Sequence, residues 1–316
     1  MFTRRTLIAV CAISASVGCH RQAAIEDHSA HMSPAPAGSA VSADPATALP
    51  ASNGKAAARL ASSTRRGQWT KIAFAPGSKD SLMAWVVYPA NARAKAPVVI
   101  VVHDIGGLSP WARAVADQAA AEGFIGISPD FTSRDRGPSQ TELTPDSARK
   151  LVGTLESAER NGVIAAAATY GMAQASAEKR YAVIGYCWGG STVFMHAING
   201  GTSGFSGGVG YYGLPYMNGA VPNADSLAKI KTPVMLFNGS KDARIGAAMP
   251  GLDSIMKKLG KNYVSKNFEG ATHGFLRSQD DPKAQRDLAE EAANLAATKE
   301  AWPRTVEFLK KNLGVR

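Results

Sequence analysis

One short segment, Gly185-Tyr186-Cys187-Trp188-Gly189-Gly190, narrows the choice of fold more than any other part of the chain. It follows a short apolar run and precedes a helical pattern, so we expect a sharp strand-to-helix turn with Cys187 at its tip. The flanking glycines let strand and helix cross without Cβ clashes, and the helix N-terminus favours a thiolate. We therefore expect Cys187 to be a nucleophile and the backbone N–H of Trp188 to donate to an oxyanion. An unreactive buried cysteine is the alternative, and it leaves the glycines unexplained.

Apolar runs alternate with helical patterns along residues 68–313. The run 96–102 is almost entirely β-branched, which is typical of a strand buried on both faces of a sheet. Residues 68–74 and 83–88 alternate apolar and polar residues, which predicts an antiparallel hairpin. We expect further strands at 124–128, 181–185, 207–212, 233–238 and 263–268, a polar loop at 129–145, and helices at 111–122, 146–174, 189–199, 246–259, 282–298 and 302–313. This alternation predicts an α/β fold with a mainly parallel central sheet, helices on both faces and one antiparallel edge.

Two residues that follow later strands fit the partners of a nucleophile. Asp242 follows the strand expected at 233–238, and His273 follows the last expected strand. The order nucleophile, acid, base is the one that an α/β sheet of this kind requires. We expect His273 to take the thiol proton and Asp242 to hold the imidazole in one tautomer. A turn-forming role is the alternative for Asp242, and a core or surface position is expected for His196.

The loop after the run 96–102 is the expected source of a second oxyanion donor. It reads His103-Asp104-Ile105-Gly106-Gly107, and its glycines allow a close approach of the backbone. We expect the N–H of Ile105 to be that donor. Asp104 would place a carboxylate near the thiol, and a turn or helix cap is its alternative role.

Composition excludes several classes of protein. The chain is 45% hydrophobic, which is enough to form a core, so wholesale disorder is excluded. The formal net charge is +10, but Lys and Arg do not form a stripe with interleaved aromatic residues, so we expect no nucleic-acid partner. A preference for anionic small molecules is a more modest use of that charge. The three cysteines have no metal-binding spacing, and we expect no metal and no organic cofactor.

The first 18 residues have the layout of an export signal, with a basic start, an apolar run at 7–18 and small residues around Cys19. Thr3-Arg4-Arg5-Thr6-Leu7 resembles a twin-arginine signal. Ser16-Val17-Gly18-Cys19 resembles a lipoprotein processing box, in which Cys19 would carry the lipid. A soluble export signal cut nearby is the alternative. We expect a periplasmic or envelope protein that touches the membrane only through such an anchor.

Residues 19–66 are rich in Ala, Ser and Pro and lack a sustained helical or strand period. We interpret them as a flexible tether that cannot form a core. The predicted organisation is therefore a signal peptide at 1–18, a tether at 19–66 and one α/β domain at 67–316.

At the Cys187 segment, at Val209-Gly210-Tyr211-Tyr212-Gly213 and at residues 111–130, the chain resembles the dienelactone hydrolase family of α/β-hydrolases. The resemblance implies a catalytic triad of Cys187, Asp242 and His273. It also implies oxyanion donors at Ile105 and Trp188.

The same resemblance implies residues that bind or respond to the substrate. Asp104 stands where the family has a Glu that handles the thiol proton, one methylene shorter. Arg277 matches an arginine that binds a substrate carboxylate, with Arg149 as a second candidate and Tyr211 as a further substrate-binding residue. Gly274 stands where the family has a Ser.

These interpretations predict an exported enzyme that hydrolyses esters or lactones of small molecules through a thioester. The alternatives are a general carboxylesterase or thioesterase, a peptidase-like acyl hydrolase, and a non-catalytic binding protein of the envelope. The sequence leaves the substrate and the oligomeric state open.

Overall fold

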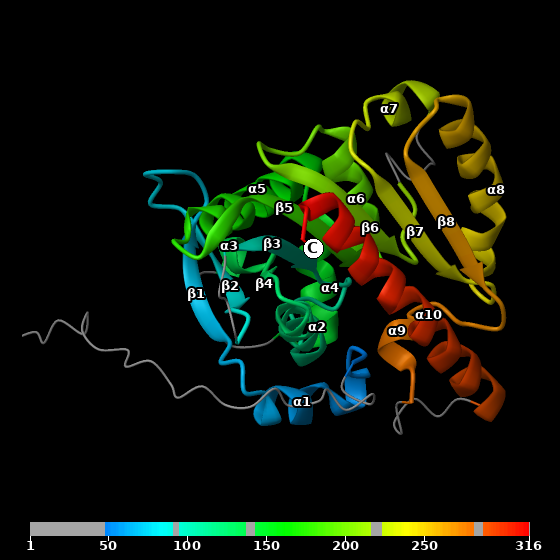
Figure 1. The fold of residues 1–316 in the computed structure, drawn as a ribbon, viewed down its shortest axis with the longest axis horizontal. Helices are drawn as coiled ribbons and strands as arrows, with labels where there is room; N and C mark the ends of the chain where they lie inside the picture. Colours follow the sequence, from blue (N-terminus) through cyan, green and yellow to red (C-terminus); the bar gives the residue numbers. More distant parts are fainter. Residues whose placement is uncertain (1–47, 91–94, 137–142, 216–222, 281–286, 316) are drawn as a thin grey trace, which may run out of the picture. The chain divides into compact units, whose positions relative to one another are not determined.

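The computed structural model describes residues 48–90, 95–136, 143–215, 223–280 and 287–315 (Figure 1). Eight strands form one sheet in the order β1-β2-β4-β3-β5-β6-β7-β8. β2 is antiparallel to both of its neighbours, and all the other pairs are parallel. The strands are β1 (Gln68–Ala73), β2 (Ser81–Val87), β3 (Ala96–Val102), β4 (Ile125–Pro129), β5 (Ala177–Tyr186), β6 (Phe205–Tyr211), β7 (Val234–Gly239) and β8 (Tyr263–Phe268). The predicted α/β sheet with an antiparallel edge is confirmed.

Helices cover both faces of the sheet (Figure 1). The reason is visible in β3, where Val99 and Val101 join one buried cluster while Val98 and Ile100 join the other. Successive side chains of a strand point to opposite faces, so a strand without polar residues needs cover on both sides. The helices are α1 (Ala56–Ser62), α2 (Pro110–Ala121), α3 (Ser133–Arg136), α4 (Pro145–Thr154), α5 (Ser157–Ala173), α6 (Trp188–Ile198), α7 (Ala224–Ala228), α8 (Ala243–Lys258), α9 (Phe275–Ser278) and α10 (Leu288–Leu313).

Three element boundaries differ from the sequence prediction. The helix expected at 146–174 is divided into α4 and α5, because the buried Leu155 adopts an extended conformation. The two helices expected at 282–298 and 302–313 are one helix, α10. Pro303 removes one backbone hydrogen bond there, but Trp302 before it and Leu309 after it are both buried and keep the helix continuous. The loop expected at 129–145 contains the short helix α3.

The largest difference concerns residues 48–66, which we call the docked N-terminal segment. We expected them to belong to the flexible tether, but they form a short 3-10 helix at Asn53–Lys55 followed by α1. Ala51 and Ala56 are buried, and the Trp111 indole of α2 donates to the carbonyl of Ala51 at 3.0 Å. The prediction failed because a few small buried residues and backbone carbonyls hold the segment. Such contacts leave no hydrophobic period in the sequence.

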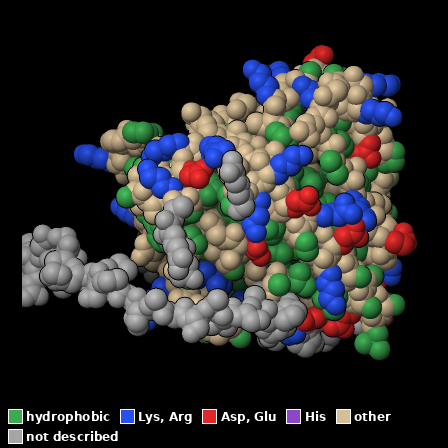
Figure 2. Space-filling view, in the orientation of Figure 1, with side chains coloured by type: hydrophobic (Ala, Val, Ile, Leu, Met, Phe, Trp, Pro, Cys, Tyr) green, Lys and Arg blue, Asp and Glu red, His purple; other side chains and the backbone are tan. Residues whose placement is uncertain are grey.

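Lys and Arg side chains are scattered and mixed with Asp and Glu on the face shown in Figure 2, so the positive net charge does not gather into one stripe there. Within the described ranges, no helix has the length and apolarity needed to cross a membrane.

Candidate active site

Cys187 lies at the tip of a sharp turn between β5 and α6, with φ 57° and ψ −115°. Residues other than glycine seldom adopt this backbone conformation, and such strain is concentrated at functional sites. A Cβ at position 185 would lie 2.3 Å from the carbonyl oxygen of Gly189, and a Cβ at position 189 would lie 2.4 Å from that of His103. Real Cβ atoms do not come that close to an oxygen. The structure therefore confirms why both positions are glycine: the strand and the helix cross too closely for a Cβ atom.

The structure brings Asp242 and His273 to Cys187. Asp242 follows β7 and His273 follows β8, and the carboxyl ends of parallel strands meet at one edge of the sheet. His273 Nδ1 lies 2.5 Å from Asp242 Oδ2, and both His273 and Cys187 line the same cavity. The other oxygen, Asp242 Oδ1, caps α8 by accepting the N–H of Ile245 at 3.3 Å. The cap holds the carboxylate that faces the imidazole, so both roles considered for Asp242 are present together.

The surroundings of His273 favour its protonated form, the imidazolium. Burial opposes a charge on His273, but the hydrogen bonds to Asp242 and Cys187 and their negative charges raise the pKa of His273 to about 9. Burial likewise opposes the charge on Asp242, and its hydrogen bond with His273 keeps the pKa of Asp242 below its usual value. The arrangement therefore stabilises an imidazolium beside the Cys187 sulfur near neutral pH.

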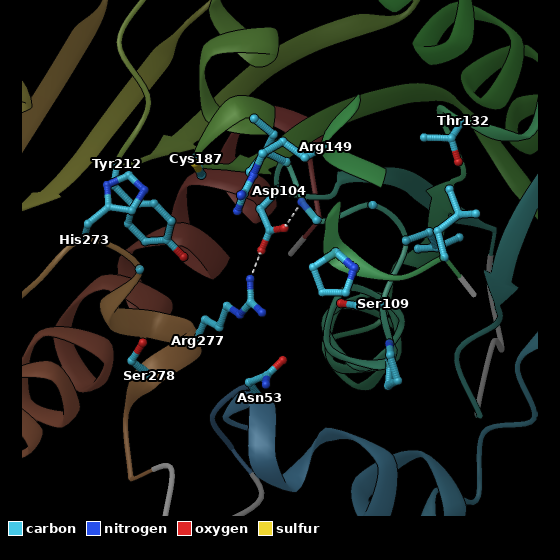
Figure 3. A pocket seen from close by; sticks show the side chains of 18 of the residues that line it. Asn53, Asp104, Ser109, Thr132, Arg149, Cys187, Tyr212, His273, Arg277 and Ser278 are labelled. Carbon is cyan, nitrogen blue, oxygen red and sulfur yellow. Dashed lines mark hydrogen bonds and ion pairs between the residues drawn. The ribbon is translucent and has the colours of Figure 1, made fainter. Parts of the chain in front are cut away.

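Asp104 lies in the loop after β3, and each of its carboxylate oxygens has a partner. Its Oδ1 accepts the backbone N–H of Gly106 at 2.7 Å, and its Oδ2 forms an ion pair with Arg277 of α9 (Figure 3). The side chain is only 9% exposed, whereas that of Arg277 is 38% exposed. The guanidinium therefore covers the carboxylate from the solvent side. The capping role that the sequence left open for Asp104 is present, in addition to the ion pair.

His103 is buried beneath this loop and stays neutral. Burial lowers the pKa of His103. Its Nε2 accepts the backbone N–H of Phe131 at 3.4 Å, so Nδ1 carries the proton and donates to the carbonyl of Asp104 at 2.7 Å. The ring also stacks on Trp188, with centroids 5.8 Å apart. His103 thus fixes the backbone of the loop relative to the start of α6.

A cavity of about 720 Å³ opens above Cys187. Asp104, Ile105, Cys187, His273 and Arg277 all line it, so most of the predicted site residues face one space (Figure 3). Arg149 of α4 lines it as well, as the sequence suggested. Trp188 contributes the first backbone N–H of α6, next to Cys187, while its ring packs against both His103 and Phe131.

Tyr211 is a wrong prediction as a substrate-binding residue. It is the last residue of β6, fully buried, and its hydroxyl is 2.6 Å from Thr305 Oγ1 of α10. The neighbouring Tyr212 lines the cavity instead and packs on His273, with ring centroids 5.0 Å apart. Tyr212 has φ 38°, so it turns out of the strand alternation, and only its place just after a strand end could have signalled this.

Asn53 is a cavity residue that sequence reasoning missed altogether. It belongs to the docked N-terminal segment, and no motif marks it. His196 fits its expected core position, since it is buried and hydrogen-bonded to Tyr181 at 2.8 Å and to Asn161 at 2.6 Å. No cluster of three or more His, Cys, Asp or Glu side chains among the described residues could hold a metal ion.

A mainly parallel sheet, a strained nucleophile turn after β5, and acid and base loops after β7 and β8 define an α/β-hydrolase. A model of the dienelactone hydrolase family matches residues 82–313. The chain belongs to the dienelactone hydrolase family.

Two comparisons illustrate the relationship. A carboxymethylenebutenolidase of Pseudomonas sp. (strain P51) is 30% identical over 227 residues, which cover 70% of this chain and 87% of the relative. The crystal structure of dienelactone hydrolase from Anabaena variabilis ATCC 29413 has a TM-score of 0.52 and 16% identity, and the alignment covers 77% of this chain and 99% of that one. The second comparison supports the fold alone.

Proposed function

We propose that this chain is an exported hydrolase of ester or lactone bonds, with Cys187, His273 and Asp242 as its catalytic triad. Cys187 at a strained turn and His273, held by Asp242, line one cavity, and this arrangement is the observation that carries the proposal. The relative from Pseudomonas sp. (strain P51) is a carboxymethylenebutenolidase, which supports a small lactone as the substrate class.

The proposed reaction proceeds through a thioester. The Cys187 sulfur attacks the carbonyl carbon and forms a tetrahedral intermediate. The C–O bond of the ester or lactone then breaks, and the His273 imidazolium gives its proton to the leaving oxygen. A water molecule next attacks the thioester while His273 takes a proton from it, and the thiolate leaves. The products are a carboxylic acid and an alcohol or enol, and the enzyme returns to its starting charge.

The backbone N–H groups of Ile105 and Trp188 would hold the developing oxyanion. The geometry at His103 supports the first of these. The peptide between Asp104 and Ile105 has its carbonyl held by the His103 ring, and in a trans peptide the N–H points away from the carbonyl. The N–H of Ile105 is thereby held in a fixed direction.

The ion pair between Asp104 and Arg277 suggests how an anionic substrate would affect the site. A substrate carboxylate that binds Arg277 competes with Asp104 for the guanidinium. Asp104 would then be released from its ion pair, and the family resemblance implies that a carboxylate at this position handles the proton of the thiol.

Replacing Cys187 with Ala tests the proposed function. We expect the hydrolysis of p-nitrophenyl acetate to fall by several orders of magnitude, because the nucleophile is removed. The thermal unfolding midpoint should not change, because the Cys187 side chain is only partly buried. Cys187→Ser, which keeps the shape of the side chain, serves as the matched variant. Hydrolysis by Cys187→Ala within tenfold of the parent protein contradicts the assignment.

Export rests on residues 1–47, which lie outside the described residues, and so do the signal and Cys19. We propose cleavage before Cys19 and lipid attachment to its sulfur, on the strength of the sequence patterns given above. Intact-mass measurement of the protein from its native membrane fraction tests this. A mature N-terminus other than Cys19, without added lipid mass, contradicts it.

A further inference from the structure

The docked N-terminal segment contributes a wall to the catalytic cavity. Asn53 lines this cavity together with Cys187, Arg277 and Ser278. In Figure 3, Asn53 and Cys187 lie on opposite sides of the Asp104–Arg277 pair. The family model matches residues 82–313, so the segment that carries Asn53 lies before the matched part of the chain.

Hydrogen bonds fix the backbone just before Asn53. The Trp111 indole donates to the carbonyl of Ala51 at 3.0 Å, and the Gln279 amide donates to that of Pro50 at 2.8 Å. Gln279 and Trp111 are both buried. The backbone that leads to Asn53 is therefore fixed by two buried donors, and such preorganisation lowers the entropy lost when a ligand binds.

The other end of the segment is held by a buried ion pair. Arg65 Nη2 lies 2.7 Å from Asp117 Oδ2 on α2, and the Ser63 hydroxyl donates to Asp117 Oδ1 at 2.7 Å. The Asp117 side chain is only 2% exposed. Breaking such a pair leaves a buried charge without a partner, so the segment is held firmly at both ends.

The Trp111 side chain that holds Ala51 also contacts the residue before the nucleophile. The Trp111 ring packs edge-to-face on Tyr186, with centroids 4.7 Å apart. Tyr186 is the residue before Cys187. One aromatic contact therefore connects the nucleophile turn to the residue that holds the docked N-terminal segment.

The chemistry of the Asn53 wall suits a polar or anionic group. No described residue hydrogen-bonds the Asn53 amide, so its two N–H donors remain available to a ligand. Arg149 and Arg277 line the same cavity. Two carboxylates also line it, but Asp104 is paired with Arg277, and Asp130 accepts the Thr132 hydroxyl at 2.7 Å. An acyl group that ends in a carboxylate would find donors here.

We propose that Asn53 is a specificity-determining residue, which donates a hydrogen bond to the distal carboxylate of an acyl substrate whose carbonyl lies at Cys187. This inference rests on the proposed function. It adds that the docked N-terminal segment, which lies outside the family match, selects the substrate.

The test compares two chromogenic esters of similar size, p-nitrophenyl hydrogen succinate and p-nitrophenyl butyrate, which differ by a terminal carboxylate. With the full chain, Asn53→Asp should lower kcat/KM for the succinate about tenfold, through an increase in KM, because the introduced carboxylate repels that of the substrate. Asn53→Ala should lower it about three- to tenfold through loss of a charge-assisted hydrogen bond. Both variants should hydrolyse the butyrate like the parent protein.

Ala58→Asp is the matched control, because it adds the same charge on an exposed position of α1 that does not line the cavity. It should leave both substrates unaffected. Equal effects of Asn53→Asp on the two esters, or equal effects of Asn53→Asp and Ala58→Asp on the succinate, overturn the role of Asn53. If the parent protein hydrolyses neither ester, the proposed function itself fails, and this outcome is distinct from a loss of selectivity.

Discussion

Asp242→Asn offers a sharp test of the charge balance at the site. The asparagine oxygen can still accept the hydrogen bond from His273 Nδ1, while the amide NH2 group stands where the second carboxylate oxygen accepted the N–H of Ile245, and the negative charge is lost. Burial opposes a charge on His273, but the hydrogen bond to Asp242 is the largest of the effects that raise the pKa of His273 from 6.5 to about 9, and the charge of Asp242 adds to it. Without that charge we expect the pKa to fall part of the way back to its ordinary value.

The size of the effect follows from the protonated fraction of His273. At about pH 7.5 a group with a pKa of about 9 is almost fully protonated, whereas one at 6.5 is about one-tenth protonated. An imidazolium beside a cysteine sulfur favours attack by that sulfur, so we expect the reactivity of Cys187 to fall with that fraction. Cys187 itself still favours the imidazolium, which limits the loss. We therefore expect alkylation of Cys187 by iodoacetamide to slow about three- to tenfold near neutral pH.

The assay follows the modified Cys187 peptide by mass spectrometry at a series of pH values. The variant should approach the parent rate as the pH rises above about 9, because the parent protein loses the proton of His273 there as well. Asp225→Asn, at the start of α7 and away from the cavity, removes the same charge and should have no effect. An unchanged pH profile in Asp242→Asn would refute the imidazolium beside the Cys187 sulfur.

Three further predictions follow from the packing and charge of the site. Gly189→Ala should lower the free energy of unfolding by about 1–3 kcal/mol in urea titrations, because its Cβ would lie 2.4 Å from the His103 carbonyl; a loss below about 0.5 kcal/mol contradicts the close approach. Burial lowers the pKa of His196 from 6.5 to about 3, so only the unfolded chain gains its proton as the pH falls below 6.5, and stability is lost there. The pH dependence of unfolding between pH 6.5 and about pH 5 should therefore be smaller by about 2 kcal/mol in His196→Gln, and equal slopes contradict this. Asp104→Glu should preserve or raise hydrolysis of lactones that carry a carboxylate, and Asp104→Asn should alter the pH dependence of Cys187 alkylation; parent-like alkylation profiles in both variants leave Asp104 with a capping role only.

Local patterns carried most of the fold and the centre of the site. A β-branched run such as Ala96–Val102 has to be buried on both faces, and this requires parallel neighbours and helices on either side. The glycines around Cys187 indicate a tight crossing within a few residues of the nucleophile. Asp242 and His273 were predictable because residues just after parallel strands meet at one edge of the sheet, whatever their separation in sequence.

Contacts between distant segments decided the remaining features. Leu155 ends α4 because it is buried against the domain, and α10 continues through Pro303 because Trp302 and Leu309 anchor it on both sides. Neither effect has a local pattern, because propensity gives way to burial.

The cavity wall shows the same division. Tyr211 and Tyr212 are neighbours of the same type, and only a positive φ at Tyr212 decides which of them faces the site. Asn53 reaches the cavity because the Trp111 and Gln279 side chains hold the backbone carbonyls before it. The sequence alone therefore determined which residues perform the proposed chemistry, since each of them follows a strand that a local pattern predicts. Only the tertiary structure determined which residues surround the substrate, because that depends on where distant segments pack.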